Sequence, residues 1–179
     1  MQIVRSSFGF PPFEDKNNIR YQKNLGGGAL FDAGAYTIKI AQIFLGNDIY
    51  VDSASLVEPP ECEVDISGSG FIKQKNGSTT AQIGFGFNNF YQNSLEIWGT
   101  QGRLLADRIF TAGPGVEPSV LIETKNGVET ITSLQDNHFK NMLDYFYDLI
   151  KTRVNRNSEY ADNLNQGRLL KEFYEKSQN

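Results

Sequence analysis

Apolar and polar positions follow different periods in different parts of the chain. Residues 28–45 carry apolar side chains at helical spacing, and Gly46 and Asn47 follow them as a helix stop signal. Between residues 49 and 133, runs of five to ten residues alternate apolar with polar side chains, which is typical of strands with one covered face. Helical spacing returns after residue 136. The pattern therefore predicts an early helix, then a sheet, then closing helices.

The strand pattern and the turn residues predict an α+β domain with a mostly antiparallel sheet. Asn76-Gly77 and Asn126-Gly127 are typical of two-residue hairpin turns of type I′, in which both central residues have a positive φ. Strands joined by such turns run antiparallel. We expect strands at residues 2–10, 49–57, 64–73, 79–88, 94–99, 103–107, 120–124 and 129–133.

The expected strand at residues 79–88 divides its side chains unevenly between its two faces. Ala81 and Phe85 point one way, whereas Gly84 and Gly86 point the other way. A face without side chains admits close approach by a ligand or a partner sheet. The alternative is a bend or bulge in a strongly twisted strand, and both interpretations stay open at this point.

The first closing helix carries a single apolar stripe. Its apolar side chains recur every three or four residues, so we expect the stripe to pack into the core rather than to hold a cofactor. A second helical segment, with fewer apolar contacts, follows from residue 158. The stripe consists of Phe139, Met142, Leu143, Phe146, Leu149 and Ile150.

Composition narrows the class of protein. With 179 residues, 39% of them hydrophobic, the chain can bury one core, and we expect a single domain over residues 1–179. A net charge of −4 without a basic run argues against a nucleic-acid partner. Cys62 is the only cysteine in the sequence, so we expect neither a disulfide nor a metal site. The sequence contains no apolar run long enough to span a bilayer, and we expect a cytoplasmic protein with no membrane partner.

A glycine run opens the first helix and is followed by two polar side chains one turn apart. Gly26, Gly27 and Gly28 precede Asp32 and Tyr36, which a helix places on one face. Because glycine weakens a helix, the run favours a backbone that another body approaches closely. Alternatively, Asp32 is an acid favoured by the helix dipole, and Tyr36 is a half-buried core aromatic. We interpret the pair as residues of chemistry or substrate binding.

The same residues carry a resemblance to a known family. Residues 26–36 read G-G-G-A-L-F-D-A-G-A-Y, which is similar to the G-G-G-A-L-x-D-x-G-x-(H or Y) helix in the C-terminal domain of the Gfo/Idh/MocA oxidoreductases. Residues 6–12, 18–21 and 96–102 extend the resemblance over nearly the whole chain. The resemblance implies an open mixed sheet with helices on one face. The other face would pack against a second subunit, which implies a homo-oligomer formed through the β-sheet.

The resemblance also implies roles for the site residues. Tyr36 would be the catalytic acid/base that exchanges a proton with a sugar or polyol substrate. Asp32 would accept hydrogen bonds from substrate hydroxyls or orient the Tyr36 phenol. Arg20 would hold a sugar-nucleotide phosphate or the cofactor edge, and a solvated loop arginine is the equal alternative. Gly27 and Gly28 would contact substrate or cofactor, and that cofactor would be NAD or NADP.

Family members begin with a Rossmann domain that grips the dinucleotide, and this sequence contains none. Gly68-Ser69-Gly70 and Gly84-Phe85-Gly86 lie in strand-like runs without a following helix, so neither is a dinucleotide-binding motif. We expect a missing N-terminal nucleotide-binding domain as the partner and no dehydrogenase activity from the isolated chain. The alternative function is a non-catalytic carbohydrate-binding or dimerisation module. An acid/base isomerase or dehydratase has less support, because no second base is well placed.

Overall fold

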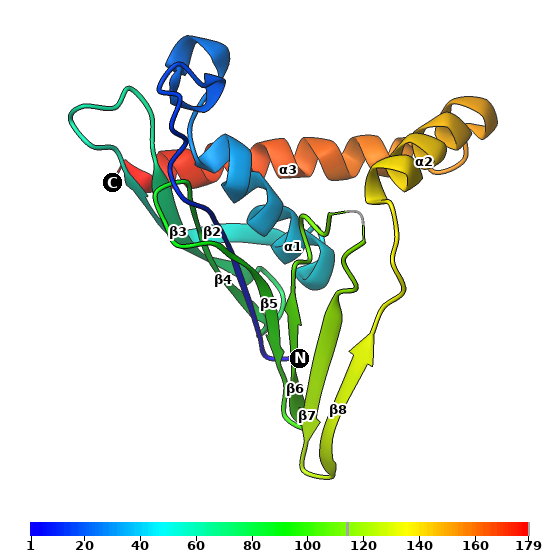
Figure 1. The fold of residues 1–179 in the computed structure, drawn as a ribbon. Coiled ribbons are helices and arrows are strands. Elements are labelled where there is room, and N and C mark those ends of the chain that lie inside the picture. Colours follow the sequence, from blue (N-terminus) through cyan, green and yellow to red (C-terminus); the bar gives the residue numbers. More distant parts are fainter. Residues whose placement is uncertain (114, 179) are drawn as a thin grey trace.

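The computed structural model describes residues 1–113 and 115–178, which form one sheet with helices on one of its faces (Figure 1). This architecture confirms the predicted α+β class with an open mixed sheet. The strands are β1 Ile3–Gly9, β2 Ile49–Val57, β3 Ser67–Gln74, β4 Thr80–Gly86, β5 Gln92–Trp98, β6 Gly102–Asp107, β7 Ser119–Thr124 and β8 Gly127–Thr132. The helical elements are the 3₁₀ turns η1 Ile19–Tyr21 and η2 Lys23–Leu25, the π-helical turn η3 Leu30–Gly34, and the helices α1 Ala35–Leu45, α2 His138–Thr152 and α3 Arg156–Ser177.

The first strand of the chain lies in the middle of the sheet. The spatial order is β2-β3-β4-β1-β5-β6-β7-β8, and β1 pairs in parallel with β4 and antiparallel with β5. The other neighbouring strands of this order run antiparallel. The central place of β1 brings the loop that follows it close to the start of the first helix, where the candidate site lies.

Both predicted hairpins are present, but the predicted turn geometry is wrong. β3 and β4 are antiparallel neighbours, as are β7 and β8. Of the four predicted turn residues only Gly127 has a positive φ, of 139°, and Gly127 is the first residue of β8, paired with Thr124. The turn before β8 is therefore Lys125-Asn126, because the ladder extends one residue further than the Asn-Gly pattern implies. The β3–β4 connection spans residues 75–79 and is longer than a two-residue turn.

The core lies between α1, the second half of α3 and strands β1 to β4. Phe85 of β4 and Phe173 of α3 are buried with their ring centroids 5.6 Å apart. A Cβ at Gly70 of β3 would overlap the Phe173 ring, so the glycines of β3 make room for core rings rather than for a dinucleotide.

The predicted bare face of β4 is confirmed at Gly84 but not at Gly86, where a Cβ would overlap Asn89 Oδ1. Ala81 and Phe85 are buried under the helices, while Gly84 lies on the open face, where the nearest atom to a Cβ would be Ser7 Oγ at 3.9 Å. β4 pairs residue by residue with both β1 and β3, without a register shift. The glycine therefore belongs to a regular strand with an open face, and the bend interpretation is wrong.

The prediction that the α2 stripe packs into the core is wrong. Five of its side chains are between 53% and 63% exposed, and α2 has no buried residue. α2 forms a hairpin with α3, in which the Tyr145 hydroxyl donates to Glu159 at 2.7 Å. Figure 1 shows α2 at the end of α3 opposite the C-terminus, beyond the part of the sheet that the helices cover. The five side chains are Phe139, Met142, Leu143, Phe146 and Ile150.

Candidate functional site

The helix that carries the candidate site begins with a widened turn. Gly34 N–H donates to the Ala29 carbonyl at 2.8 Å, a five-residue spacing, and regular α-helix follows from Ala35. Such single π-turns inside helices occur frequently at functional sites. The predicted helix over residues 28–45 is thus correct in extent, with a local change of geometry between the two residues of interest.

A buried carboxylate closes the N-terminus of this helix. Asp65, in the segment between β2 and β3, is 7% exposed, and its Oδ2 accepts from Leu30 N–H at 2.7 Å. Its backbone carbonyl accepts from Ala29 N–H at 2.9 Å. Burial raises the pKa of the Asp65 carboxyl above its usual range, while the hydrogen bond from Leu30 acts in the opposite direction. Asp65 thus occupies the position where a helix N-terminus could otherwise bind an anion.

The glycine run is approached closely by the chain itself. A Cβ at Gly27 would lie 2.6 Å from the Arg20 carbonyl oxygen, and a Cβ at Gly28 would overlap Asp65 Oδ1. Gly28 also has a φ of +116° and donates its N–H to the Arg20 carbonyl at 2.9 Å. Gly28 is therefore the junction between the Asp65 cap and the loop that holds Arg20. Contact of Gly27 and Gly28 with substrate or cofactor stays a prediction.

Asp32 pairs with Arg20. Arg20 Nε donates to Asp32 Oδ2 at 2.5 Å, and both side chains are about one-third exposed or less. The guanidinium also lies over the Phe13 ring, 4.8 Å from its centroid. Asp32 makes no hydrogen bond to Tyr36 within the part of the chain that the structure describes. Asp32 therefore holds the Arg20 guanidinium, and direct contact of Asp32 with substrate hydroxyls stays a prediction.

Tyr36 is held by its ring and has a free hydroxyl. Phe8 and Phe110 contact the ring edge-to-face, with centroid distances of 5.4 and 5.7 Å. Tyr36 is 46% exposed, and among residues 1–113 and 115–178 its hydroxyl finds no hydrogen-bond partner. A phenol that is fixed at one end and free at the other can donate a proton or a hydrogen bond to a bound molecule.

Sequence reasoning missed Phe110 and the residue that places it. Asn93 of β5 is 4% exposed, and its Oδ1 accepts from Phe110 N–H at 3.0 Å. Its carbonyl accepts from Arg108 N–H at 2.7 Å, and Arg108 has a positive φ of 55°. The loop after β6 is therefore folded over Asn93 so that Phe110 reaches Tyr36. The only sequence signal was an amide at an inward-facing strand position.

The glycine run at the start of the site helix is occupied by hydrogen bonds within the chain. The backbone N–H groups of Gly27, Gly28, Ala29 and Leu30 donate to Gln22, Arg20 and Asp65, so these four groups are not free to bind a phosphate. In residues 1–113 and 115–178 there is also no cluster of three metal-ligating side chains. No helix in these ranges is both long and apolar enough to cross a membrane.

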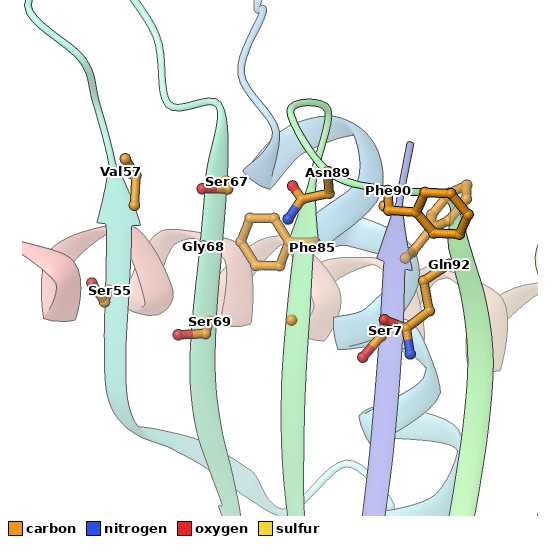
Figure 2. A pocket seen from close by; sticks show the side chains of 13 residues that line it. Ser7, Ser55, Val57, Ser67, Gly68, Ser69, Phe85, Asn89, Phe90 and Gln92 are labelled. Atoms are coloured by element: carbon orange, nitrogen blue, oxygen red, sulfur yellow. The ribbon is translucent and has the colours of Figure 1, made fainter. Parts of the chain in front are cut away.

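A second candidate surface lies on the open face of the sheet. A hollow of about 470 Å³ crosses strands β2, β3, β4, β1 and β5. Figure 2 shows its lining residues, with the helices behind the sheet. Phe90 stands at its rim and is 93% exposed. Hydroxyl and amide groups with one aromatic ring suit hydrogen bonding to a polar ligand or partner. Its polar lining consists of Ser7, Ser55, Ser67, Ser69, Asn89 and Gln92.

Comparisons with known proteins agree with the fold. One curated relative is a dTDP-3,4-didehydro-2,6-dideoxy-alpha-D-glucose 3-reductase from Saccharopolyspora spinosa, 41% identical over 125 residues, or 70% of this chain and 37% of the relative. The reductase of the same name from Actinomadura kijaniata is 32% identical over 165 residues, which are 92% of this chain and 49% of the relative. A solved structure of a 3-ketoreductase from Actinomadura kijaniata with NADP and TDP-benzene matches with a TM-score of 0.89 at 30% identity, covering 95% of this chain and 52% of that one.

The chain thus spans about half the length, or less, of these relatives. The family model described as the GFO/IDH/MocA C-terminal domain matches residues 1–105, which is more than half of the chain. The glycine run, Asp32 and Tyr36 all lie within the matched residues. The chain belongs to the GFO/IDH/MocA C-terminal domain family.

Proposed function

We propose that this chain is the substrate-binding and oligomerisation half of an NADP-dependent sugar oxidoreductase that reduces a sugar carbonyl or oxidises the corresponding hydroxyl. The observation that carries the proposal is the Tyr36 phenol, fixed by Phe8 and Phe110 with its hydroxyl free. The relatives support NADP, since the ketoreductase structure holds it. A nicotinamide held by another domain would supply the hydride in reduction and accept it in oxidation. A cytoplasmic location is part of the same proposal.

Tyr36 would move the proton. In the reductive direction, the phenolic O–H would donate to the sugar oxygen as the carbonyl becomes a hydroxyl. The two aromatic contacts hold the ring so that the proton donor does not have to be ordered when substrate binds. Asp32 would act through Arg20 rather than through Tyr36, because its carboxylate accepts from the Arg20 guanidinium.

Arg20 would hold the anionic part of a sugar nucleotide. Its Nε is bound by Asp32, its Nη1 donates to Asn18 Oδ1 at 3.5 Å, and its flat face lies over Phe13, which leaves Nη2 for a ligand. The names of the two reductases describe dTDP-linked sugars. We therefore propose a diphosphate-linked sugar ahead of a neutral sugar or polyol.

The test is kinetic and uses the full-length product of the gene. Tyr36→Phe should lower kcat about 10²- to 10⁴-fold, because it removes only the proton donor, with little change in KM. The matched control is Tyr174→Phe, because this tyrosine of α3 is 44% exposed, similar to Tyr36. An unchanged kcat for Tyr36→Phe would contradict the catalytic role. The isolated chain should bind substrate and show negligible turnover.

A non-catalytic carbohydrate-binding or dimerisation module remains the second candidate because of the hollow on the open face. A homo-oligomer formed through the same face belongs to both proposals, since a partner sheet would cover the hollow. Glycan binding by the isolated chain that Ser69→Lys abolishes and Tyr36→Phe leaves intact would favour the module. Sugar-nucleotide binding that Arg20→Gln abolishes would favour the enzyme half.

A further inference from the structure

The α2 stripe, defined above as Phe139, Met142, Leu143, Phe146 and Ile150, forms an apolar surface without a partner. Each of the five side chains exposes more than half of its surface. The opposite side of α2 is polar, and there Lys140 pairs with Asp144 at 2.5 Å. Soluble proteins rarely expose a contiguous apolar patch on such a scale unless another surface covers it. The amphipathic pattern is therefore that of a helix with one covered face.

The β7–β8 end of the sheet is also uncovered on its helix side. α1 and α3 pack on strands β1 to β4. Ile131 of β8 lies opposite Val120, and the same row of cross-strand pairs continues through Ala106 to the buried Leu95. Ile131 therefore lies on the helix side of the sheet, yet it is 48% exposed. The helix side of the β7–β8 hairpin is thus a second surface that no helix covers within the described residues.

The uncovered region lies on the same side of the sheet as the candidate site. Phe110, which packs on Tyr36, belongs to the connection between β6 and β7. A body seated against the helix side of β7 and β8 and against α2 would therefore border the loop that positions Tyr36. A second copy joined through the open face would lie on the opposite side and would leave this region bare.

We infer that the α2 stripe is the docking surface for the nucleotide-binding half of the same polypeptide. The inference rests on the proposed function. The curated relatives and the ketoreductase structure are about twice as long as the matched segment, and the family model describes a C-terminal domain, so as much chain again precedes it in the relatives. Interfaces between domains of one chain bury about 600–1,500 Å², and the five large apolar side chains of the α2 stripe would form the apolar centre of such an interface.

Hydrogen–deuterium exchange on the full-length gene product tests the docking. Peptides covering residues 138–152 should exchange about 100-fold more slowly there than in the 179-residue chain, because docking removes local opening of α2. The variant Phe139→Ser/Met142→Ser/Phe146→Ser should lose this protection. The matched control Asn141→Ser/Asp148→Ser, on the polar side, should keep it. A single Phe146→Ala variant repeats the test with less risk to the helix.

Two results would overturn the inference. One is an α2 that exchanges equally fast in the full-length protein and in the 179-residue chain. The other is protection of α2 that appears only as the concentration of this chain rises, which would make a second copy the occupant. Turnover and NADP binding are measured on the same samples. Docking without turnover would contradict the proposed function alone, and turnover with an exposed α2 would contradict this inference alone.

Discussion

Removing the Asp65 carboxylate should destabilise the start of the site helix by a predictable amount. Asp65→Ala leaves Leu30 N–H buried without its acceptor, while Ala29 N–H keeps the backbone carbonyl of residue 65. A buried donor without a partner costs about 1–3 kcal/mol. The raised pKa of Asp65 shows that the buried charge is itself unfavourable, and its removal offsets part of that loss. We expect a net loss of about 1–2 kcal/mol.

The assay is thermal unfolding followed by circular dichroism at neutral pH. For a chain of this length, about 1–2 kcal/mol corresponds to a Tm lower by about 2–8 °C. Asp65→Asn is the matched control, because its amide oxygen still accepts from Leu30 N–H and the charge is gone. It should cost less than about 1 kcal/mol. An equal Tm for wild type and Asp65→Ala, or equal losses for the two variants, would refute the capping argument.

A double-mutant cycle with Gly28 separates the cap from general packing. Gly28→Ala introduces a Cβ that would overlap Asp65 Oδ1 at a backbone φ of +116°, which costs about 1–3 kcal/mol for the backbone alone. In Gly28→Ala/Asp65→Ala the overlap is gone and only the backbone strain remains. The double variant should therefore be about 1 kcal/mol more stable than the sum of the single losses predicts. Strict additivity would show that the two residues do not meet as the structure places them.

The remaining predictions concern pH, the site and the open face. The pKa of Asp65 is raised above its usual value of 3.8, so the folded state binds the proton more tightly than the unfolded state. The free energy of unfolding of wild type should therefore fall relative to that of Asp65→Asn as pH rises through the raised pKa, and denaturant titrations from pH 3 upward measure this difference. Arg20→Gln should raise KM for a sugar nucleotide about tenfold or more in the full-length enzyme and leave KM for a neutral sugar unchanged, because only the former offers an anion. Phe110→Ala should lower kcat about threefold to tenfold by freeing the Tyr36 ring, while Phe90→Ala, at the opposite face, should not. Gly84→Lys has space on the open face, so the chain should fold but sediment as a monomer where wild type sediments as an oligomer.

Sequence patterns were sufficient for the fold class and for most element positions. The β2 strand has the predicted bounds, and the helix pattern at residues 28–45 covers η3 and α1. Periodicity indicates which face of a helix is apolar, but it does not identify the surface that covers this face. The α2 stripe has the pattern of a core-facing helix, yet it lies outside the core. The place of β1 between β4 and β5 is likewise invisible in an alternating pattern.

The sequence pointed to Asp32, Tyr36 and Arg20 as candidate site residues, whose roles stay predictions, but not to the residues that position them. Asp32 and Tyr36 share a helix, so spacing alone relates them, whereas Arg20 and Asp32 are 12 positions apart and pair only because the segment between them folds back. Phe110 reaches Tyr36 from the connection between β6 and β7, where Asn93 of β5 holds its backbone, and no local pattern encodes such a contact. Contacts between residues that are far apart in the sequence depend on the order of the strands in the sheet, and local patterns do not determine that order.

The Asp65 cap also bears on which of the two proposed halves would bind the phosphates of the dinucleotide. A helix start preceded by glycines is a natural anion site, yet here each N–H group from Gly27 to Leu30 already has an acceptor within the chain. A dinucleotide phosphate would have to displace a buried carboxylate to bind there, and the two negative charges would repel. The glycine run therefore serves to seat Arg20 and to start the helix that presents Tyr36. The phosphate grip would then belong to the half that docks on α2, and the catalytic site would form only where the two halves meet.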